Sequence, residues 1–185
     1  MLKENRRARV YPSNVGQGFI PCLIGIAMKK EFSVRKRIRL DSSLYSDPAH
    51  VCSVTICTQR SLPVFGNCEF GKACVRILLE YSRKKGIPIF AYCFMPDHVH
   101  LLLSAATGCS IPSFIGGLKS LCAGVGWRRF DLEKSFWQKR YYDHFLRKEE
   151  DVGVVIRYIL DNPVRKCLVE DWREYPLSGS FVYEL

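Results

Sequence analysis

Two short apolar segments, residues 87–94 and 98–104, are separated by a Met-Pro-Asp turn. Both are rich in aromatic, β-branched and leucine residues, and both are short, which predicts two strands joined as a hairpin. Successive side chains of a strand point to opposite faces, so His98 and His100 share one face and the residue between them points to the other. This hairpin is the expected centre of a sheet, with two imidazoles side by side.

Paired imidazoles on one face of a sheet admit two interpretations. Neutral imidazole nitrogens are common metal ligands, so His98 and His100 could hold one divalent ion. The alternative is that both rings only form hydrogen bonds at the end of the sheet. A second group of residues further along the chain bears on this choice.

Residues 149–163 predict an amphipathic helix that carries a tyrosine and an amide. Apolar residues recur in this segment at three- and four-residue steps, and Pro163 is expected to end the helix. Tyr158 and Asn162 are four residues apart, so they lie about one turn apart on one face. The pair could serve a single site, or it could be a half-buried aromatic residue followed by a C-cap amide.

The rest of the pattern predicts a small α+β domain. The expected elements are, in order, a strand at 50–58, a helix at 69–85, the hairpin, a helix at 110–124, a strand at 141–147 and the helix of Tyr158. With the hairpin counted as two strands, the elements before the helix of Tyr158 follow the order β-α-β-β-α-β, which is typical of a ferredoxin-like sandwich. We therefore expect a central antiparallel sheet with the helices on one face.

The net charge of +10 is unevenly distributed. Residues 1–40 hold ten Lys or Arg against Glu4 and Glu31, whereas the remainder of the chain is close to neutral. We expect a basic N-terminal extension at 1–40 and one domain of ordinary size at 41–185. The overall charge is therefore not in itself a sign that the folded domain binds nucleic acid.

The start of the chain and the cysteines both bear on location. Residues 19–28 form an apolar run that is too short to span a membrane, and basic residues follow it at once, which is a poor context for export. We expect Met28 to be the true start, with 1–27 a mis-assigned extension.

The nine cysteines form no Cys-x-x-Cys pair, and most lie among apolar residues, which favours reduced thiols in a cytoplasmic protein.

Three motifs occur in a fixed order: Met-Pro-Asp-His-Val-His-Leu-Leu-Leu at 95–103, Phe-Trp-Gln-Lys-Arg-Tyr-Tyr-Asp-His at 136–144 and Tyr-Ile-Leu-Asp-Asn-Pro-Val at 158–164. On these motifs the chain resembles the HUH-class single-strand tyrosine transposases, and most of all their REP-associated, IS200-like branch. The resemblance covers most of the chain. It departs near the carboxyl end, where Leu177 and Gly179 stand in place of the family's usual Trp and Ser.

The resemblance implies a DNA transposase that nicks and rejoins hairpin-forming DNA through a 5′-phosphotyrosyl intermediate. Tyr158 would be the nucleophile, and His98, His100 and Asn162 would hold Mg²⁺ or Mn²⁺. A phenol with a pKa of about 10 is a poor nucleophile at neutral pH, so it needs positioning and a nearby metal. The implied partner is single-stranded or hairpin DNA, bound by a monomer or a homodimer.

Several alternatives remain open at this point. Tyr141 and Tyr142 are rival nucleophiles, and the chain could be a non-catalytic, domesticated binder of repeat hairpins. A replication-initiator nickase shares the chemistry but usually comes in a longer chain. The candidate contacts to DNA are Lys139, Arg140, His144, Arg147, Arg165 and Lys166. His144 could instead be a buried structural residue.

Overall fold

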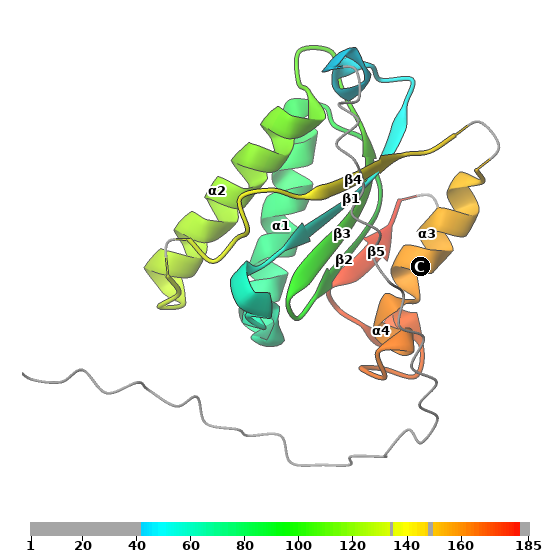
Figure 1. Cartoon of the computed structure of the whole chain (residues 1–185). Coiled ribbons are helices and arrows are strands. Elements are labelled where there is room, and N and C mark those ends of the chain that lie inside the picture. Colours follow the sequence, from blue (N-terminus) through cyan, green and yellow to red (C-terminus); the bar gives the residue numbers. More distant parts are fainter. Residues whose placement is uncertain (1–41, 134, 148–149, 182–185) are drawn as a thin grey trace, which may run out of the picture. The chain divides into compact units, whose positions relative to one another are not determined.

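The computed structural model describes residues 42–133, 135–147 and 150–181 (Figure 1). The expected N-terminal extension and the choice between Met1 and Met28 as the start lie outside these residues. One five-stranded antiparallel sheet, in the order β4-β1-β3-β2-β5, forms the centre of the domain. Its strands are β1 (Val51–Cys57), β2 (Ile89–Met95), β3 (His98–Ser104), β4 (Tyr142–Phe145) and β5 (Ser178–Ser180).

The two long helices cover one face of this sheet. They are α1 (Cys68–Lys85) and α2 (Ile111–Arg129), and each begins at a side-chain cap, Asn67 and Ser110 respectively. Gly86, with φ +66°, ends α1 in the left-handed conformation that glycine adopts without strain. The order of helices and strands along the chain and the order β4-β1-β3-β2 within the sheet confirm the ferredoxin-like α+β fold.

The core between the sheet and these helices is built from alternate residues of each strand. On β3, the odd-numbered residues Val99, Leu101 and Leu103 are buried beneath α1 and α2. The even-numbered residues, including both histidines, therefore point to the opposite face. Large aromatic side chains fill the space above the strands, namely Phe65, Phe70, Phe94, Phe114 and Phe136.

The opposite face is partly covered by α3 (Val152–Leu160), which is followed directly by α4 (Asn162–Arg165) (Figure 1). The apolar stripe of α3, with Ile156 and Ile159 at its centre, packs on Ala91, Cys93 and Leu102. The expectation of helices on one face thus holds for α1 and α2 but not for α3. A second apolar stripe needs its own apolar surface, and the small residues of β2 provide it.

The short strand β5 was not predicted. Its sequence Ser-Gly-Ser has no strand signal, yet it pairs with β2 from Ala91 to Cys93. Gly179 makes this possible, because a Cβ there would lie 2.7 Å from the Tyr92 hydroxyl. Leu177, directly before the strand, is 2% exposed and packs against Gly71. A Cβ atom on Gly71 would lie only 2.5 Å from Leu177 Cδ1. The residues that depart from the family pattern are therefore matched to their neighbours.

Leu177→Ala is expected to destabilise the domain by about 2–5 kcal/mol, because it removes a buried side chain and leaves a cavity beside Gly71. Urea unfolding followed by circular dichroism would measure the loss. Leu168, which is 44% exposed, is the matched control, and its replacement by alanine should change stability by no more than about 0.5 kcal/mol. Equal effects of the two substitutions would contradict the packing described for Leu177.

Within the described residues, no helix has the length and the apolar character that crossing a bilayer requires.

Most of the described cysteines lie in the core. Of the eight cysteines described, those buried in the domain are Cys52, Cys74, Cys93, Cys109 and Cys122. These five confirm the interpretation of most cysteines as small core residues.

Candidate active site

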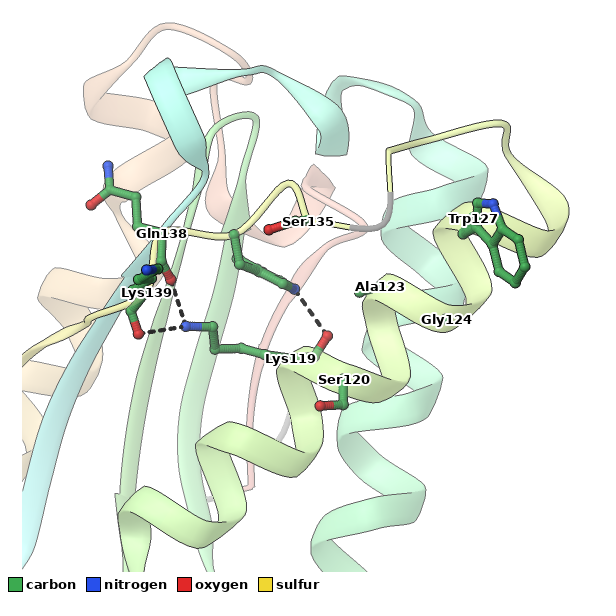
Figure 2. Close-up of a pocket in the computed structure, with 9 residues that line it drawn as sticks. Lys119, Ser120, Ala123, Gly124, Trp127, Ser135, Gln138 and Lys139 are labelled. Carbon is green, nitrogen blue, oxygen red and sulfur yellow. Dashed lines mark hydrogen bonds between the residues drawn. The ribbon is translucent and has the colours of Figure 1, made fainter.

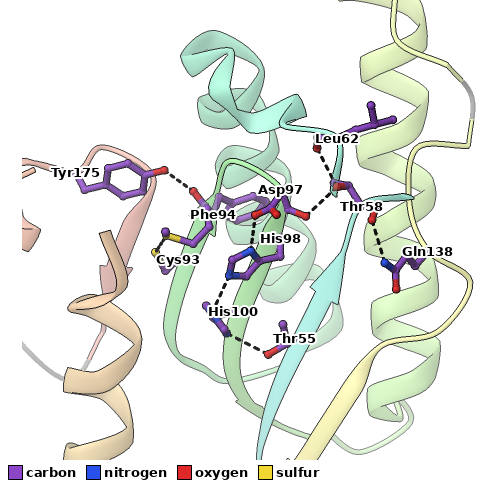
Figure 3. A network of polar contacts seen from close by, with 11 residues as sticks. Thr55, Thr58, Leu62, Cys93, Phe94, Asp97, His98, His100, Gln138 and Tyr175 are labelled. Carbon is purple, nitrogen blue, oxygen red and sulfur yellow. Dashed lines mark hydrogen bonds and ion pairs between the residues drawn. The ribbon is translucent and has the colours of Figure 1, made fainter. Parts of the chain in front are cut away.

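The end of the β2–β3 hairpin brings His98 and His100 into direct contact. Their Nε2 atoms lie 3.1 Å apart, and the two rings are nearly perpendicular, with centroids 4.8 Å apart (Figure 3). Thr55 lies opposite His100 on β1, and Cys93 lies opposite it on β2. The pair is thus held on the central strand of the sheet, on the face that α3 covers only in part.

The second nitrogen of each ring is fixed by a neighbour. His98 Nδ1 lies 2.6 Å from Asp97 Oδ1, and His100 Nδ1 lies 3.1 Å from Thr55 Oγ1. In the neutral tautomer that donates from Nδ1 to this carboxylate, His98 Nε2 carries a lone pair. The threonine hydroxyl can donate or accept, so it satisfies either tautomer of His100. This arrangement is typical of metal-binding histidines, whose outer nitrogen is oriented by a carboxylate or another oxygen.

His100 is strongly biased toward its neutral form. Burial, followed by the charges of His98 and Arg165, lowers the pKa of His100 to about 4. A neutral imidazole keeps the lone pair that a metal needs, whereas an imidazolium cannot bind. At pH 7, therefore, His100 has the protonation state of a ligand.

The two Nε2 atoms are at hydrogen-bond distance, 3.1 Å, so the rings hold each other directly. The same separation is close to the distance of about 3.0 Å between adjacent ligands placed at about 2.1 Å from an octahedral Mg²⁺. Within the described ranges, no group of three or more His, Cys, Asp or Glu side chains is gathered to hold a metal. Further ligands would have to be an amide, water or substrate oxygens.

The two residues predicted on the second helix lie where it ends. Tyr158 is 52% exposed near the end of α3, and Asn162 is buried at the first position of α4. Asn162 Nδ2 donates to the carbonyls of Tyr158 (3.0 Å) and Ile159 (3.3 Å), so it satisfies carbonyls near the end of α3, although the C-cap residue of that helix is Asp161. These bonds use only Nδ2, so Oδ1 is the atom that a metal could take. Pro163 does not end α3 but lies in the first turn of α4, where its missing N–H costs nothing.

Arg165 stacks on the tyrosine and adds positive charge that acts on His100. Its guanidinium carbon lies 4.6 Å from the centre of the Tyr158 ring, and its charge is one of the causes that lower the pKa of His100. Among the contacts of the described residues, none joins Tyr158 or Asn162 directly to either histidine. Arg165 was predicted only as a DNA contact, and its stacking on Tyr158 could not be seen in a pattern that spans two helices.

The rival tyrosines on β4 differ in their surroundings. Tyr142 is 70% exposed and lies opposite Thr55, so it shares the face of the histidines, one strand further from His100. Tyr141 packs against the main core, and burial, with smaller contributions from Asp143 and Cys52, raises its pKa to about 12. Tyr141 is therefore a poor candidate for a phenolate, whereas Tyr142 remains accessible.

The predicted DNA contacts do not form one cluster. His144 is exposed rather than buried, and its Nε2 lies 2.8 Å from a Glu150 carboxylate oxygen. It lies opposite Ser53 and thus on the histidine face. Among the described residues, no contact joins any of these candidates to the histidine pair; Arg165 acts on His100 only through its charge. The other exposed members of the set are Lys139, Arg140, Arg147 and Lys166.

Comparison with known proteins shows which family of sequences this chain matches. Residues 48–162 match the family model described as IS200-like transposase. A protein of Haemophilus influenzae assigned as a REP-associated tyrosine transposase is 29% identical over 99 residues, which cover 48% of this chain and 56% of that protein. The ISDra2 transposase TnpA of Deinococcus radiodurans is 43% identical over 47 residues, which cover 25% of this chain and 34% of that protein. The matches thus span about half and about a third of these relatives.

One solved structure supports the fold. The structure of a REP-associated tyrosine transposase bound to a REP hairpin superposes with a TM-score of 0.57 at 20% identity. The match covers 72% of this chain and 78% of that one. The resemblance drawn from the three sequence motifs is confirmed by these comparisons.

Proposed function

The chain belongs to the IS200-like transposase family, and we propose that it nicks and rejoins single strands of hairpin-forming DNA through a 5′-phosphotyrosyl intermediate on Tyr158. The observation that carries this proposal is the 3.1 Å approach of the His98 and His100 Nε2 atoms. The exposed Tyr158 ring stacks on Arg165, whose charge is one of the causes that lower the pKa of His100. A protein that only bound hairpins would need neither a pair of oriented imidazoles nor an exposed tyrosine that stacks on an arginine.

The residues fit a hard divalent ion, Mg²⁺ or Mn²⁺. His98 and His100 would hold it through Nε2, and Asn162 Oδ1 would be a third ligand. When bound, the ion supplies positive charge that polarises a non-bridging phosphate oxygen. Asp97 and Thr55 keep both rings oriented for this role.

The residues of the chain supply the nucleophile and its positioning. The Tyr158 hydroxyl loses its proton to solvent and attacks phosphorus, so a phosphotyrosyl bond forms and the bond to the 3′-oxygen breaks. The leaving oxygen takes up a proton and becomes a free 3′-hydroxyl. Arg165, stacked on the ring, holds the phenol in place and puts positive charge beside the developing phenolate. One phosphodiester is exchanged for another, so the step needs no ATP.

Hairpin DNA is the proposed substrate because a structural relative is bound to a REP hairpin. The test is to incubate the purified protein with end-labelled hairpin strands from the flanks of its own gene. We expect a nick and a covalent adduct with Mg²⁺ or Mn²⁺ and neither product with EDTA. Tight hairpin binding without any nick, with either ion, would contradict the enzyme and favour the non-catalytic binder.

Asp97→Asn is expected to weaken Mn²⁺ binding by roughly 10- to 100-fold, the usual cost of losing a carboxylate that orients a ligating histidine. The carboxamide keeps the shape but not the charge that fixes the His98 proton. Titration calorimetry with Mn²⁺ would measure the change. Glu80→Gln makes the same change of charge on an exposed residue of α1, on the opposite face of the sheet, and should leave Mn²⁺ affinity unchanged. Equal affinity of the Asp97 variant and the parent would show that Asp97 does not orient the ligand.

A further inference from the structure

Two successive carbonyls at the turn of the β2–β3 hairpin are held by residues outside the hairpin. The Asp97 carbonyl accepts from the Thr58 backbone N–H (2.9 Å) and from Thr58 Oγ1 (2.8 Å) (Figure 3). The Pro96 carbonyl accepts from the Phe65 N–H (3.0 Å). Asp97 also carries the carboxylate that lies 2.6 Å from His98 Nδ1. The backbone from which this carboxylate projects is therefore held mainly by Thr58.

The Thr58 side chain is completely buried directly after β1. Its hydroxyl also lies 2.8 Å from the Leu62 carbonyl, so one hydroxyl proton is shared between two acceptors. Each of these carbonyls has a backbone donor as well, which is the Thr58 N–H for Asp97 and the Val64 N–H (2.8 Å) for Leu62. Loss of the hydroxyl alone would therefore leave neither carbonyl without a partner, and the fold should tolerate it.

The sequence motif that begins at residue 136 holds Thr58 from its other side. Gln138 Nε2 donates to the Thr58 carbonyl (3.1 Å), and Thr58 forms an antiparallel bridge with Trp137 (Figure 3). Trp137 is buried, and its Nε1 donates to the Lys119 carbonyl of α2 (3.1 Å). Lys119 Nζ in turn donates to the Gln138 carbonyl (2.6 Å) (Figure 2). The motif is thus joined both to α2 and to the residue that holds the hairpin turn.

We propose that Thr58 and Gln138 are positioning residues for the metal site, and that they act on His98 through Asp97. The Thr58 hydroxyl sets the direction of the Asp97 carboxylate, and Gln138 keeps Thr58 in place. A ligating histidine binds its ion more weakly when the carboxylate that orients it can turn away. The inference rests on the proposed function, because it assumes that His98 is a metal ligand. A role in packing alone would instead change stability without any change at His98.

The first test is titration calorimetry of Thr58→Val with Mn²⁺, since valine keeps the branched shape and lacks the hydroxyl. We expect the dissociation constant to rise by roughly 2- to 10-fold, the equivalent of one hydrogen bond. Thr58→Ser keeps the hydroxyl and should bind Mn²⁺ as the parent does. Ser82→Ala is the matched control, because it removes another buried hydroxyl, which donates to the Leu79 carbonyl within α1 (3.0 Å), and should leave Mn²⁺ affinity unchanged. Parental affinity in Thr58→Val would overturn the inference.

A double-mutant cycle shows whether Thr58 acts through Asp97. Asp97→Ala has no carboxylate to orient, so adding Thr58→Val to it should weaken Mn²⁺ binding no further. Gln138→Met keeps the length of the side chain without its Nε2 donor, and it should follow the same pattern. Losses that simply add in the double variants would overturn the inference, because general damage to the fold is additive whereas action through Asp97 is not.

The metal-free protein gives a readout that does not depend on Mn²⁺. Nitrogen NMR shows which nitrogen of an imidazole carries the proton, and in the parent we expect His98 to carry it on Nδ1, beside the Asp97 carboxylate. Thr58→Val should shift His98 toward a mixture of tautomers, whereas Ser82→Ala should not. The parental tautomer in Thr58→Val would overturn the inference and leave the proposed function standing. A parent that binds no Mn²⁺ but shows the expected shift at His98 would contradict the proposed function instead.

Discussion

Alanine in place of His98 or His100 is expected to lower the rate of metal-dependent nicking by roughly 10²- to 10⁴-fold, because each change removes a metal ligand and with it several kcal/mol of transition-state stabilisation. Single-turnover assays with Mn²⁺ on a labelled hairpin strand would measure the rate. Calorimetric titration of the same variants should show that Mn²⁺ binding is lost or strongly weakened. The effect on rate and the effect on affinity should go together.

The fold should survive both substitutions. The two rings lie on the face of the sheet that α3 covers only in part, and neither belongs to the apolar clusters of the core. His50 is the matched control, since it is a partly exposed histidine whose ion pair with Asp47 (3.4 Å) lies away from the site. His50→Ala should nick at the parental rate. A His98 or His100 variant that folds, binds DNA and cuts at the parental rate with Mn²⁺ would show that the metal assignment is wrong.

Tyr158→Phe is expected to abolish both nicking and the covalent adduct while leaving stability within about 0.5 kcal/mol of the parent. The substitution removes only the hydroxyl, so the half-exposed ring and its stacking on Arg165 remain. Loss of the nucleophile cannot be compensated by the metal, because the metal stabilises charge but does not form the bond to phosphorus. A denaturing gel would show the adduct as a labelled, protein-sized band.

Tyr142→Phe and Tyr141→Phe are the controls for this prediction. Tyr142 shares the histidine face and is more exposed than Tyr158, so it is the rival that matters. Both variants should still nick and form the adduct. Loss of the adduct in Tyr142→Phe, together with its persistence in Tyr158→Phe, would move the nucleophile to β4.

Local composition and periodicity were enough to predict most of the fold. Two short apolar segments located the β2–β3 hairpin, whose strands bury residues on both faces of the sheet. Helical spacing located α1, α2 and α3, because each helix buries a regular stripe of its own residues. The sequence could not predict β5, which has three small or polar residues and depends on the space beside Tyr92. Nor could it place α3, since an apolar stripe does not show which face of a sheet it will cover.

The candidate site, too, could be predicted from the sequence only in part. That His98 and His100 share a face follows from the two-residue repeat of a strand, and the structure confirms it. The stacking of Arg165 on Tyr158 depends on the turn between α3 and α4. The different environments of Tyr141 and Tyr142 depend on where β4 begins and on its register with β1, which neighbouring residues do not specify.

The most direct test of the account is to identify the residue that carries DNA after reaction with the parent protein. Trypsin cleaves after Lys and Arg, so Tyr158 falls in the peptide 158–165, which has no other tyrosine, whereas Tyr141 and Tyr142 fall together in 141–147. After nuclease trimming, mass spectrometry should find the 5′-phosphonucleotide on the peptide 158–165. A nucleotide on 141–147, or no modified peptide in a reaction that has produced nicks, would contradict the assignment of Tyr158 as the nucleophile.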